Sequence, residues 1–174
     1  MSFATFKTLI QDLAGRYGYD AALLASQIAA ESAFNPTARS KVGAMGLMQF
    51  MPTTWADWGN GQDPDDPAAN IDAGIRYMKW LLGQLQGTAS PQELALAAYN
   101  WGIGRVKNLI SQQGRSDWPA LRPFMPAETQ GYVDRIMSNA GTFRAAVGAV
   151  AISGTVVLAL VGGLLGLALL RRIL

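Results

Sequence analysis

One glutamate stands out as a candidate for proton chemistry, because the sequence offers few other groups. The 174-residue chain contains no cysteine and no histidine, which excludes Ser-His-Asp and Cys-His nucleophile systems and argues against a zinc site. Any acid–base step must therefore use Asp, Glu, Lys or Tyr. The only glutamates are Glu31, Glu93 and Glu128, so the list of glutamate candidates is short.

Glu31 lies on a predicted helix face that is otherwise mostly apolar. It shares this face with Leu24 and Ile28 at helical spacing. It also falls in the last turn of the helix, where the helix dipole disfavours negative charge. Burial and the dipole both raise the pKa of the carboxyl group, which favours the protonated acid that glycosidic cleavage needs. These residues alone leave an alternative open, in which Glu31 is a rim residue paired with Arg39 or Lys41.

Helical patterns dominate the elements that must position Glu31, and no alternating strand pattern of useful length appears. Asp20 is placed to cap a helix over residues 21–32. Asp66 similarly precedes a proline-started helix over residues 67–86. The sequence therefore predicts an all-α domain, with Glu31 near the end of its second helix.

The remaining elements are also predicted as helices joined by loops. Ser90 and Glu93 form the S-x-x-E pattern of a capping box before another helix. Further helices are expected over residues 2–15, 52–58, 105–112 and from about 127 onward, with a proline-rich loop at 118–126. The last helix either continues into the apolar tail or breaks near Gly141.

Three motifs stand out along the chain: ESAFNPTARSKVGAMGLMQFMPTTW at residues 31–55, AAYNWGIGRV at 97–106 and PAETQGYVDRI at 126–136. Together they resemble the soluble lytic transglycosylase family, whose fold is that of goose-type lysozyme. The motifs occur in the order typical of the family, and the resemblance covers roughly residues 8–140. It implies a lysozyme-like helical domain that acts on peptidoglycan glycan strands.

The resemblance also implies one catalytic residue and six substrate-binding positions. The catalytic acid/base is Glu31, and the substrate-binding positions are Ser40, Gln49, Met51, Tyr99, Asn100 and Glu128. In this interpretation Ser40 holds the N-acetyl group of the substrate. Tyr99 stabilises the cationic intermediate or orients the Glu31 carboxyl group.

The family's reaction needs only one carboxylate, because the substrate assists in its own cleavage. Glu31 protonates the glycosidic oxygen and then deprotonates the sugar's own primary hydroxyl, which closes an anhydro ring without water. We expect no cofactor and no metal. One alternative is a lysozyme-like hydrolase, which needs a second carboxylate from Asp57 or the 63–66 loop. A membrane-anchored glycan-binding or assembly protein on the same fold is the other.

The end of the chain predicts a single membrane span. Residues 145–170 contain no charged side chain, and as a helix they would extend over about 39 Å, enough to cross a bilayer. Arg144 precedes this segment and Arg171 and Arg172 follow it, which favours a C-terminus inside and the enzyme outside. We therefore expect a catalytic domain at residues 1–143 and a transmembrane anchor at 144–174 that contacts lipid.

Charge and targeting signals bear on partners and location. Three of the 14 basic residues lie in the tail, leaving 11 against 12 acidic residues. The catalytic part is therefore nearly neutral, and nucleic acid is not an expected partner.

The N-terminus lacks the pattern of a secretory signal. We therefore expect the virion membrane of a membrane-containing phage, or otherwise a bacterial inner membrane facing the periplasm. Oligomerisation through Gly162 and Gly166, or partners in a virion or secretion complex, are further expectations.

Overall fold

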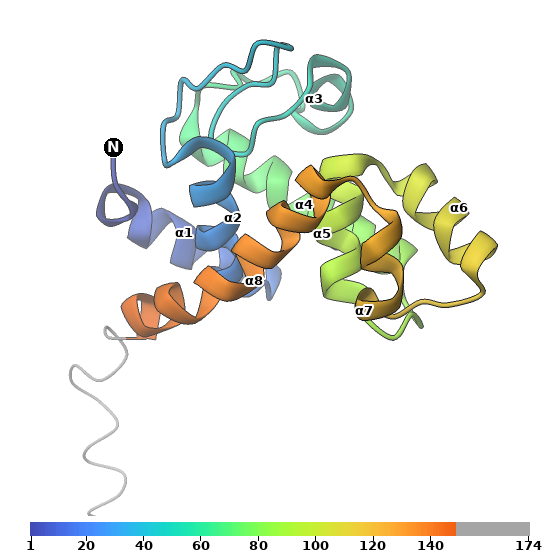
Figure 1. Ribbon diagram of the computed structural model, residues 1–174. Helices are drawn as coiled ribbons and strands as arrows, with labels where there is room; N and C mark the ends of the chain where they lie inside the picture. The colour runs from blue at the N-terminus through green and yellow to red at the C-terminus, as the bar shows by residue number, and fades with distance from the viewer. Residues whose placement is uncertain (149–174) are drawn as a thin grey trace, which may run out of the picture.

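A computed structural model describes residues 1–148, and these residues fold into helices joined by loops (Figure 1). The elements are α1 (Phe3–Tyr17), α2 (Ala21–Ser32), α3 (Pro52–Trp58), α4 (Pro67–Gln84), α5 (Pro91–Trp101), α6 (Ile103–Gln113), α7 (Trp118–Leu121), a 3-10 helix (Arg122–Phe124) and α8 (Ala127–Gly148). Within residues 1–148 the β contacts are two isolated bridges, which join Met45 to Arg39 and to Phe50. The all-α prediction is confirmed for this part of the chain.

Two of the predicted helix caps form as expected. The Asp20 carboxylate accepts hydrogen bonds from the backbone N–H groups of Ala22 and Leu23. The Asp66 carboxylate does the same for Ala68 and Ala69 at the start of α4. Each cap satisfies N–H groups that the first helical turn leaves unpaired, so the sequence located both helix starts correctly.

The predicted capping box at Ser90 is wrong. The Ser90 hydroxyl accepts a hydrogen bond from the backbone N–H of Trp118 at 2.9 Å, and makes no side-chain cap to α5. The contact joins the start of α5 to the start of α7, which are far apart in the sequence. A tertiary partner therefore replaces the local one that the S-x-x-E pattern indicated.

Residues 118–126 are also more ordered than the predicted loop. They contain α7 and the 3-10 helix, and the Asp117 carboxylate caps α7 at the N–H of Ala120. Pro119 lies in the first turn, where proline is tolerated because no intrahelical N–H bond is lost. Trp118 and Leu121 are buried, so packing favours a helical turn at this position.

The last helix, α8, passes Gly141 without a break and continues to Gly148. Near its end, the Phe143 ring packs edge-on against Phe3 and Phe34, and Arg144 forms an ion pair with Asp20. This helix therefore crosses the predicted boundary at residue 143. Residues 149–170 of the expected membrane segment lie outside the described residues. Within residues 1–148, no helix combines the length and apolar character needed to span a bilayer.

The core consists of two clusters of buried side chains. The first joins α1, α2, the loop after α2 and the first half of α4, through residues such as Ile10, Ile28 and Phe50. The second joins the end of α4 to α5, α6, α7 and α8. Tyr77 and Tyr99 pack against both clusters, so these two tyrosines lie where the halves of the core meet.

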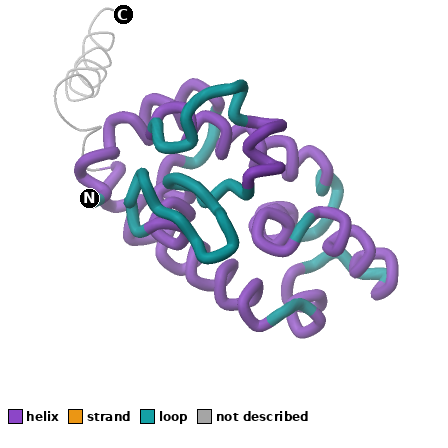
Figure 2. The backbone as a smooth tube through the Cα atoms, turned by 90° about the horizontal axis from the view of Figure 1, so that it is seen from above, coloured by secondary structure: helices purple, strands orange, loops and turns teal. Residues whose placement is uncertain are grey.

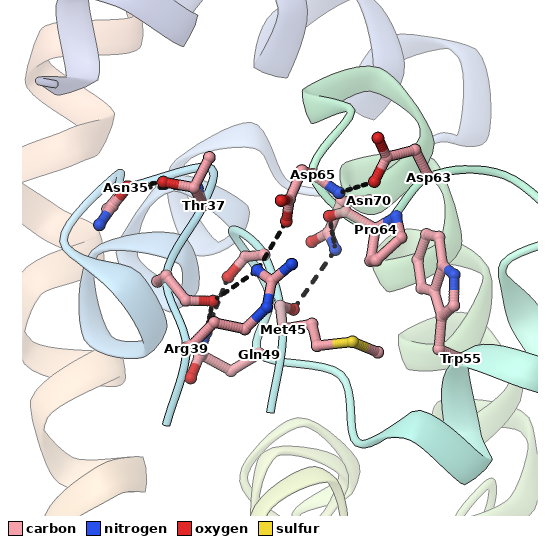
Figure 3. Close-up of polar contacts among 12 residues, drawn as sticks. Asn35, Thr37, Arg39, Met45, Gln49, Trp55, Asp63, Pro64, Asp65 and Asn70 are labelled. Atoms are coloured by element: carbon pink, nitrogen blue, oxygen red, sulfur yellow. Dashed lines mark hydrogen bonds and ion pairs between the residues drawn. The ribbon is translucent and has the colours of Figure 1, made fainter. Parts of the chain in front are cut away.

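A long loop, residues 33–51, lies at the top of the molecule in Figure 1 and faces the viewer in Figure 2. The buried Asn70 of α4 fixes this loop by accepting from the Met48 N–H at 2.8 Å and donating to the Pro64 oxygen at 2.9 Å. Gly46 has φ +75° and lies so close that an added Cβ would sit 2.2 Å from the Asn70 amide. Glycine is therefore required here for close approach. An ion pair between Arg39 and Asp65 ties the loop to residues 63–66 (Figure 3).

A candidate active site around Glu31

Glu31 lies in the last turn of α2 and is held from α8 by a tyrosine. The Tyr132 hydroxyl donates to Glu31 Oε1 at 2.5 Å. Gln27, one helical turn before Glu31, donates from Nε2 to the same Tyr132 hydroxyl at 3.1 Å. Gln27 and Tyr132 are buried, while Glu31 is only partly buried. The carboxyl group therefore has a fixed buried partner on one side and remains accessible to a substrate.

The environment of Glu31 favours its protonated form. Burial raises the pKa of the Glu31 carboxyl to about 7, although the Tyr132 hydrogen bond and the positive charge of Arg135 each lower it. A group with this pKa can give up and regain a proton near neutral pH. The rim alternative is wrong for Arg39, which instead forms an ion pair with Asp65 at 2.6 Å. Lys41 is exposed on the loop.

Three predicted substrate positions meet at one small pocket. Gln49, Met51 and Tyr99 line this cavity of about 60 Å³, together with Phe50, Thr54 and Tyr77. The Tyr99 hydroxyl donates to the backbone oxygen of Met48 at 2.8 Å, so it fixes the loop rather than orienting the Glu31 carboxyl. The Glu31 charge contributes to the raised pKa of Tyr99, which places the two residues near each other.

Gln49 is anchored within the loop, while Met51 is open to solvent. The Gln49 side-chain amide donates to the backbone oxygens of Ala38 at 3.2 Å and Gly46 at 2.9 Å (Figure 3). Its backbone has φ +49°, a conformation that a residue with a side chain rarely adopts. Met51 is 41% exposed. The pocket therefore has one rigid polar wall and one accessible apolar wall.

The other three predicted positions make different contacts. The Ser40 hydroxyl accepts from the Ala44 N–H at 2.9 Å and closes a turn within the loop. Asn100 Oδ1 accepts from the Thr129 hydroxyl at 2.7 Å, which joins the end of α5 to the start of α8. Glu128 is exposed in the first turn of α8. The described contacts thus place Asn100 beside the helix that carries Tyr132.

Sequence reasoning missed Tyr132 and Thr129, although both belong to the PAETQGYVDRI motif. They are three residues apart, so they share one face of α8. Thr129 contacts α5 and Tyr132 contacts α2. The signal was their spacing within a motif already singled out, but the partners on α2 and α5 depend on tertiary packing.

Of the acidic residues that a hydrolytic mechanism would need, those of the 63–66 loop are engaged in structural contacts. Asp63 accepts from the Asp65 N–H, Asp65 pairs with Arg39, and Asp66 caps α4. Asp57 is exposed on α3. Across residues 1–148 no group of three acidic side chains is placed to hold a metal ion. Glu31 is therefore the acidic residue best placed for chemistry in the described part of the chain.

A larger pocket, of about 290 Å³, lies between α1 and α4, beside the loop that contains Asn60. Its lining includes Arg16, Asp72 and Arg76, and none of the predicted site residues lines it. Size therefore does not identify the candidate active site. The chemistry of Glu31 and the convergence of Gln49, Met51 and Tyr99 do so.

Residues 8–119 match the family model described as the transglycosylase SLT domain. The chain is 42% identical over 113 residues to the membrane-bound lytic murein transglycosylase C of Haemophilus influenzae, covering 56% of this chain and 31% of that protein. It thus spans about a third of the length of that curated relative.

Solved structures show the same fold. A lytic transglycosylase Slt inactive mutant from Pseudomonas aeruginosa matches with a TM-score of 0.70 and 29% identity, over 82% of this chain and 24% of that one. The 70-kDa soluble lytic transglycosylase of Escherichia coli matches with a TM-score of 0.67 and 31% identity, over 79% of this chain and 24% of that one. Each match covers a minority of the longer protein.

Proposed function

The chain belongs to the transglycosylase SLT family, and we propose that it is a lytic transglycosylase that cleaves peptidoglycan glycan strands between MurNAc and GlcNAc. The observation that carries this proposal is Glu31, a partly buried carboxyl with a pKa of about 7 that is held by the Tyr132 hydroxyl. One solved relative is an inactive mutant in which a single glutamate is replaced by glutamine, which supports a reaction that depends on one glutamate.

In the first step, Glu31 acts as the general acid. The protonated carboxyl donates its proton to the glycosidic oxygen while the bond between this oxygen and C1 of MurNAc breaks. The departing sugar leaves with a hydroxyl group. The N-acetyl oxygen of the MurNAc stabilises the positive charge that develops at C1, so no protein nucleophile is needed.

In the second step, the Glu31 carboxylate acts as the general base. It takes the proton from the C6 hydroxyl of the same MurNAc, and the C6 oxygen bonds to C1 as the acetamido group is released. An anhydro ring forms and Glu31 regains its proton, so the enzyme returns to its starting state without consuming water. The Tyr132 hydroxyl stabilises the carboxylate between the steps, because it donates directly to Oε1.

The proposal also states that the reaction adds no water to the product. Its support is that Asp63, Asp65 and Asp66 are each engaged in contacts of the loop or α4, while the remaining candidate, Asp57, is exposed on α3. A hydrolase generally positions its water with a second carboxylate on the other side of the sugar. A single working carboxyl instead fits a reaction in which the substrate supplies its own nucleophile.

We propose that the chain is anchored in a membrane through residues 145–170, because this segment contains no charged side chain. The Haemophilus relative is named as membrane-bound, which is consistent with this setting. Partition of the full chain and of residues 1–148 between detergent micelles and water tests the anchor: the full chain should enter micelles and the shorter chain should not. A virion membrane of a phage, opened locally for genome delivery, stays a prediction of the sequence.

The reaction is tested by digesting purified peptidoglycan with the detergent-solubilised full chain in heavy-oxygen water. Mass spectrometry should find products with anhydromuramoyl ends and no heavy oxygen, and the Glu31→Gln protein should release none of them. Incorporation of one heavy oxygen at each cleaved bond would establish hydrolysis and replace the proposal with the lysozyme-like alternative.

A further inference from the structure

Next to the pocket, and sharing one lining residue with it, lies a group of aromatic rings to which the proposed reaction assigns no role. Trp58 ends α3, and Tyr77 and Trp80 lie on α4; together we call them the aromatic platform. The Tyr77 and Trp80 rings stack at 5.9 Å with an interplanar angle of 18°, and the Trp58 and Tyr77 rings lie 5.2 Å apart. Trp80 is 40% exposed. An indole of this size open to solvent indicates a binding surface when it adjoins a functional pocket.

The platform is continuous with the pocket beside the active site. Tyr77 lines that pocket with Gln49, Met51 and Tyr99, and the Tyr77 and Tyr99 rings are 5.2 Å apart. Trp80 follows Tyr77 by three residues, so both side chains lie on one face of α4. The aromatic surface thus leads away from the pocket along α4.

Helix α3 extends the same surface from its other side. Thr54 lines the pocket, and Trp58 follows it by four residues on the same face of the helix. The Trp58 and Trp80 rings are 6.1 Å apart. Side chains from two helices therefore converge on one aromatic patch next to the pocket.

A charged network holds one member of the platform, Trp58, in place. The Arg76 guanidinium lies 5.9 Å from the centroid of the Trp58 ring and donates to the Trp58 backbone oxygen at 2.7 Å. Its Nε pairs with Asp72 at 2.8 Å, and Asp72 accepts from the Tyr17 hydroxyl. A preorganised ring loses little conformational freedom when a ligand binds, so more of the contact energy contributes to affinity.

We propose that the aromatic platform is an additional sugar-binding subsite, in which a pyranose ring of the glycan strand stacks on Trp80. A pyranose presents C–H groups on its faces, and these pack on the electron-rich face of an indole. The inference rests on the proposed function, because a glycan strand threaded past Tyr99 would continue over Tyr77. Trp80 then selects for strands that are long enough to extend beyond the pocket.

The test uses the full chain carrying Glu31→Gln, so that binding is measured without cleavage. The probe is the N-acetylglucosamine hexasaccharide, titrated by calorimetry into the Glu31→Gln protein with Trp80→Ala or with Phe124→Ala. Phe124 is 55% exposed and lies in the 3-10 helix, outside the platform and pocket, so it is a matched control for loss of a surface aromatic. Trp80→Ala should raise the Kd by roughly 3- to 10-fold, the effect of one aromatic contact, while Phe124→Ala should leave it unchanged.

A second readout locates the contact. In a proton–nitrogen spectrum, the indole N–H signal lost in Trp80→Ala is that of Trp80, and it should shift when the hexasaccharide is added to the Glu31→Gln protein. An unchanged Kd with a static Trp80 signal, or no binding by the Glu31→Gln protein, contradicts the subsite. Conversion of a dimer to a monomer by Trp80→Ala, with the sugar affinity intact, would identify a self-association surface instead. A hexasaccharide that binds through Trp80 while the wild-type chain never cleaves peptidoglycan would contradict the proposed reaction and leave the subsite intact.

Discussion

Two carboxyl groups in this molecule each accept a 2.5 Å hydrogen bond from a tyrosine, yet their proton affinities move in opposite directions. Tyr132 donates to Glu31 at the end of α2, and Tyr17 donates to Asp72 in α4. Burial raises the pKa of Glu31 to about 7. Burial also raises the pKa of Asp72, but its Tyr17 and Arg76 contacts outweigh this effect and place it below its ordinary value.

Burial is the largest effect on both carboxyl groups, and each tyrosine lowers the pKa of the group that it contacts. The two sites differ in the balance: burial outweighs the other effects at Glu31, while at Asp72 the tyrosine is joined by a contacting cation. Arg76 forms an ion pair with Asp72 at 2.8 Å, whereas the ion pairs within residues 1–148 do not include Glu31. Arg135 acts on Glu31 through its charge alone and has the weakest effect of the three causes. A tyrosine contact alone does not offset the burial of Glu31, whereas the tyrosine and the contacting cation together keep Asp72 a carboxylate. Glu31 is therefore suited to exchange a proton, and Asp72 to support the aromatic platform.

The largest expected effect is the loss of activity in Glu31→Gln. The amide keeps the size of the side chain but has no transferable proton, so the rate of peptidoglycan cleavage should fall by about 100-fold or more. The matched variant Asp72→Asn should keep the rate within about 3-fold and lower the melting temperature, because it breaks an ion pair. Turbidity loss of a cell-wall suspension measures the rate, and circular dichroism measures melting. Equal rate losses in the two variants would contradict the proposal that Glu31 takes part in the reaction and Asp72 does not.

A smaller effect is expected from the two tyrosines. Tyr132→Phe removes a hydrogen bond that lowers the pKa of Glu31, so the fall in rate on the alkaline side should move to higher pH. The rate at its optimum should drop by roughly 10-fold, because a contact that orients the acid is lost. Tyr17→Phe removes an equally short bond and should leave the pH–rate profile in place. A profile that shifts in Tyr17→Phe, or stays fixed in Tyr132→Phe, would contradict the assignment.

The smallest expected effect is on the pH dependence of stability. Because the pKa of Glu31 is raised from its ordinary 4.5 to about 7, the folded state keeps a proton between these values that the unfolded state has lost. The unfolding free energy should therefore fall, on the order of 2 kcal/mol, as pH rises from 4.5 to 7. Glu31→Gln should remove this component when urea unfolding is measured across the range.

Asp72 should contribute in a different pH window. Its pKa lies below the ordinary value of 3.8, so its stabilising effect is present above that value and is lost as pH falls through the folded-state pKa. Asp72→Asn should thus change stability at neutral pH and leave the slope between pH 4.5 and 7 unaltered. If the slope disappears in Asp72→Asn and remains in Glu31→Gln, the group that titrates between pH 4.5 and 7 is Asp72, which contradicts the prediction.

The sequence predicted the parts of the site that depend on local structure. Asp20 and Asp66 cap their helices because the partners are two and three residues away. The apolar face around Glu31 likewise indicated burial. Ser90 failed because its hydroxyl bonds Trp118, which lies 28 residues away. A sequence pattern identifies only hydrogen-bond partners that are near in the chain, whereas the partner of Ser90 is brought to it by tertiary packing.

Tyr132 shows the same limit at the site itself. It lies 101 residues from Glu31, and only the packing of α8 against α2 brings the two together. The motif that contains it drew attention to Glu128, which is exposed. The buried setting of Glu31 was therefore predictable from its own helix, while the tyrosine that contacts it was not.

Direct titration of the carboxyl groups tests the central claim. With carbon-13 label on Glu and Asp carboxyls, NMR across pH should show one glutamate titrating near pH 7, and this signal should be absent from Glu31→Gln. Asp72, assigned through Asp72→Asn, should titrate below its ordinary value of 3.8. Glu31 titrating at or below 4.5, the ordinary value for a glutamate, would contradict its role as an acid kept protonated near neutral pH.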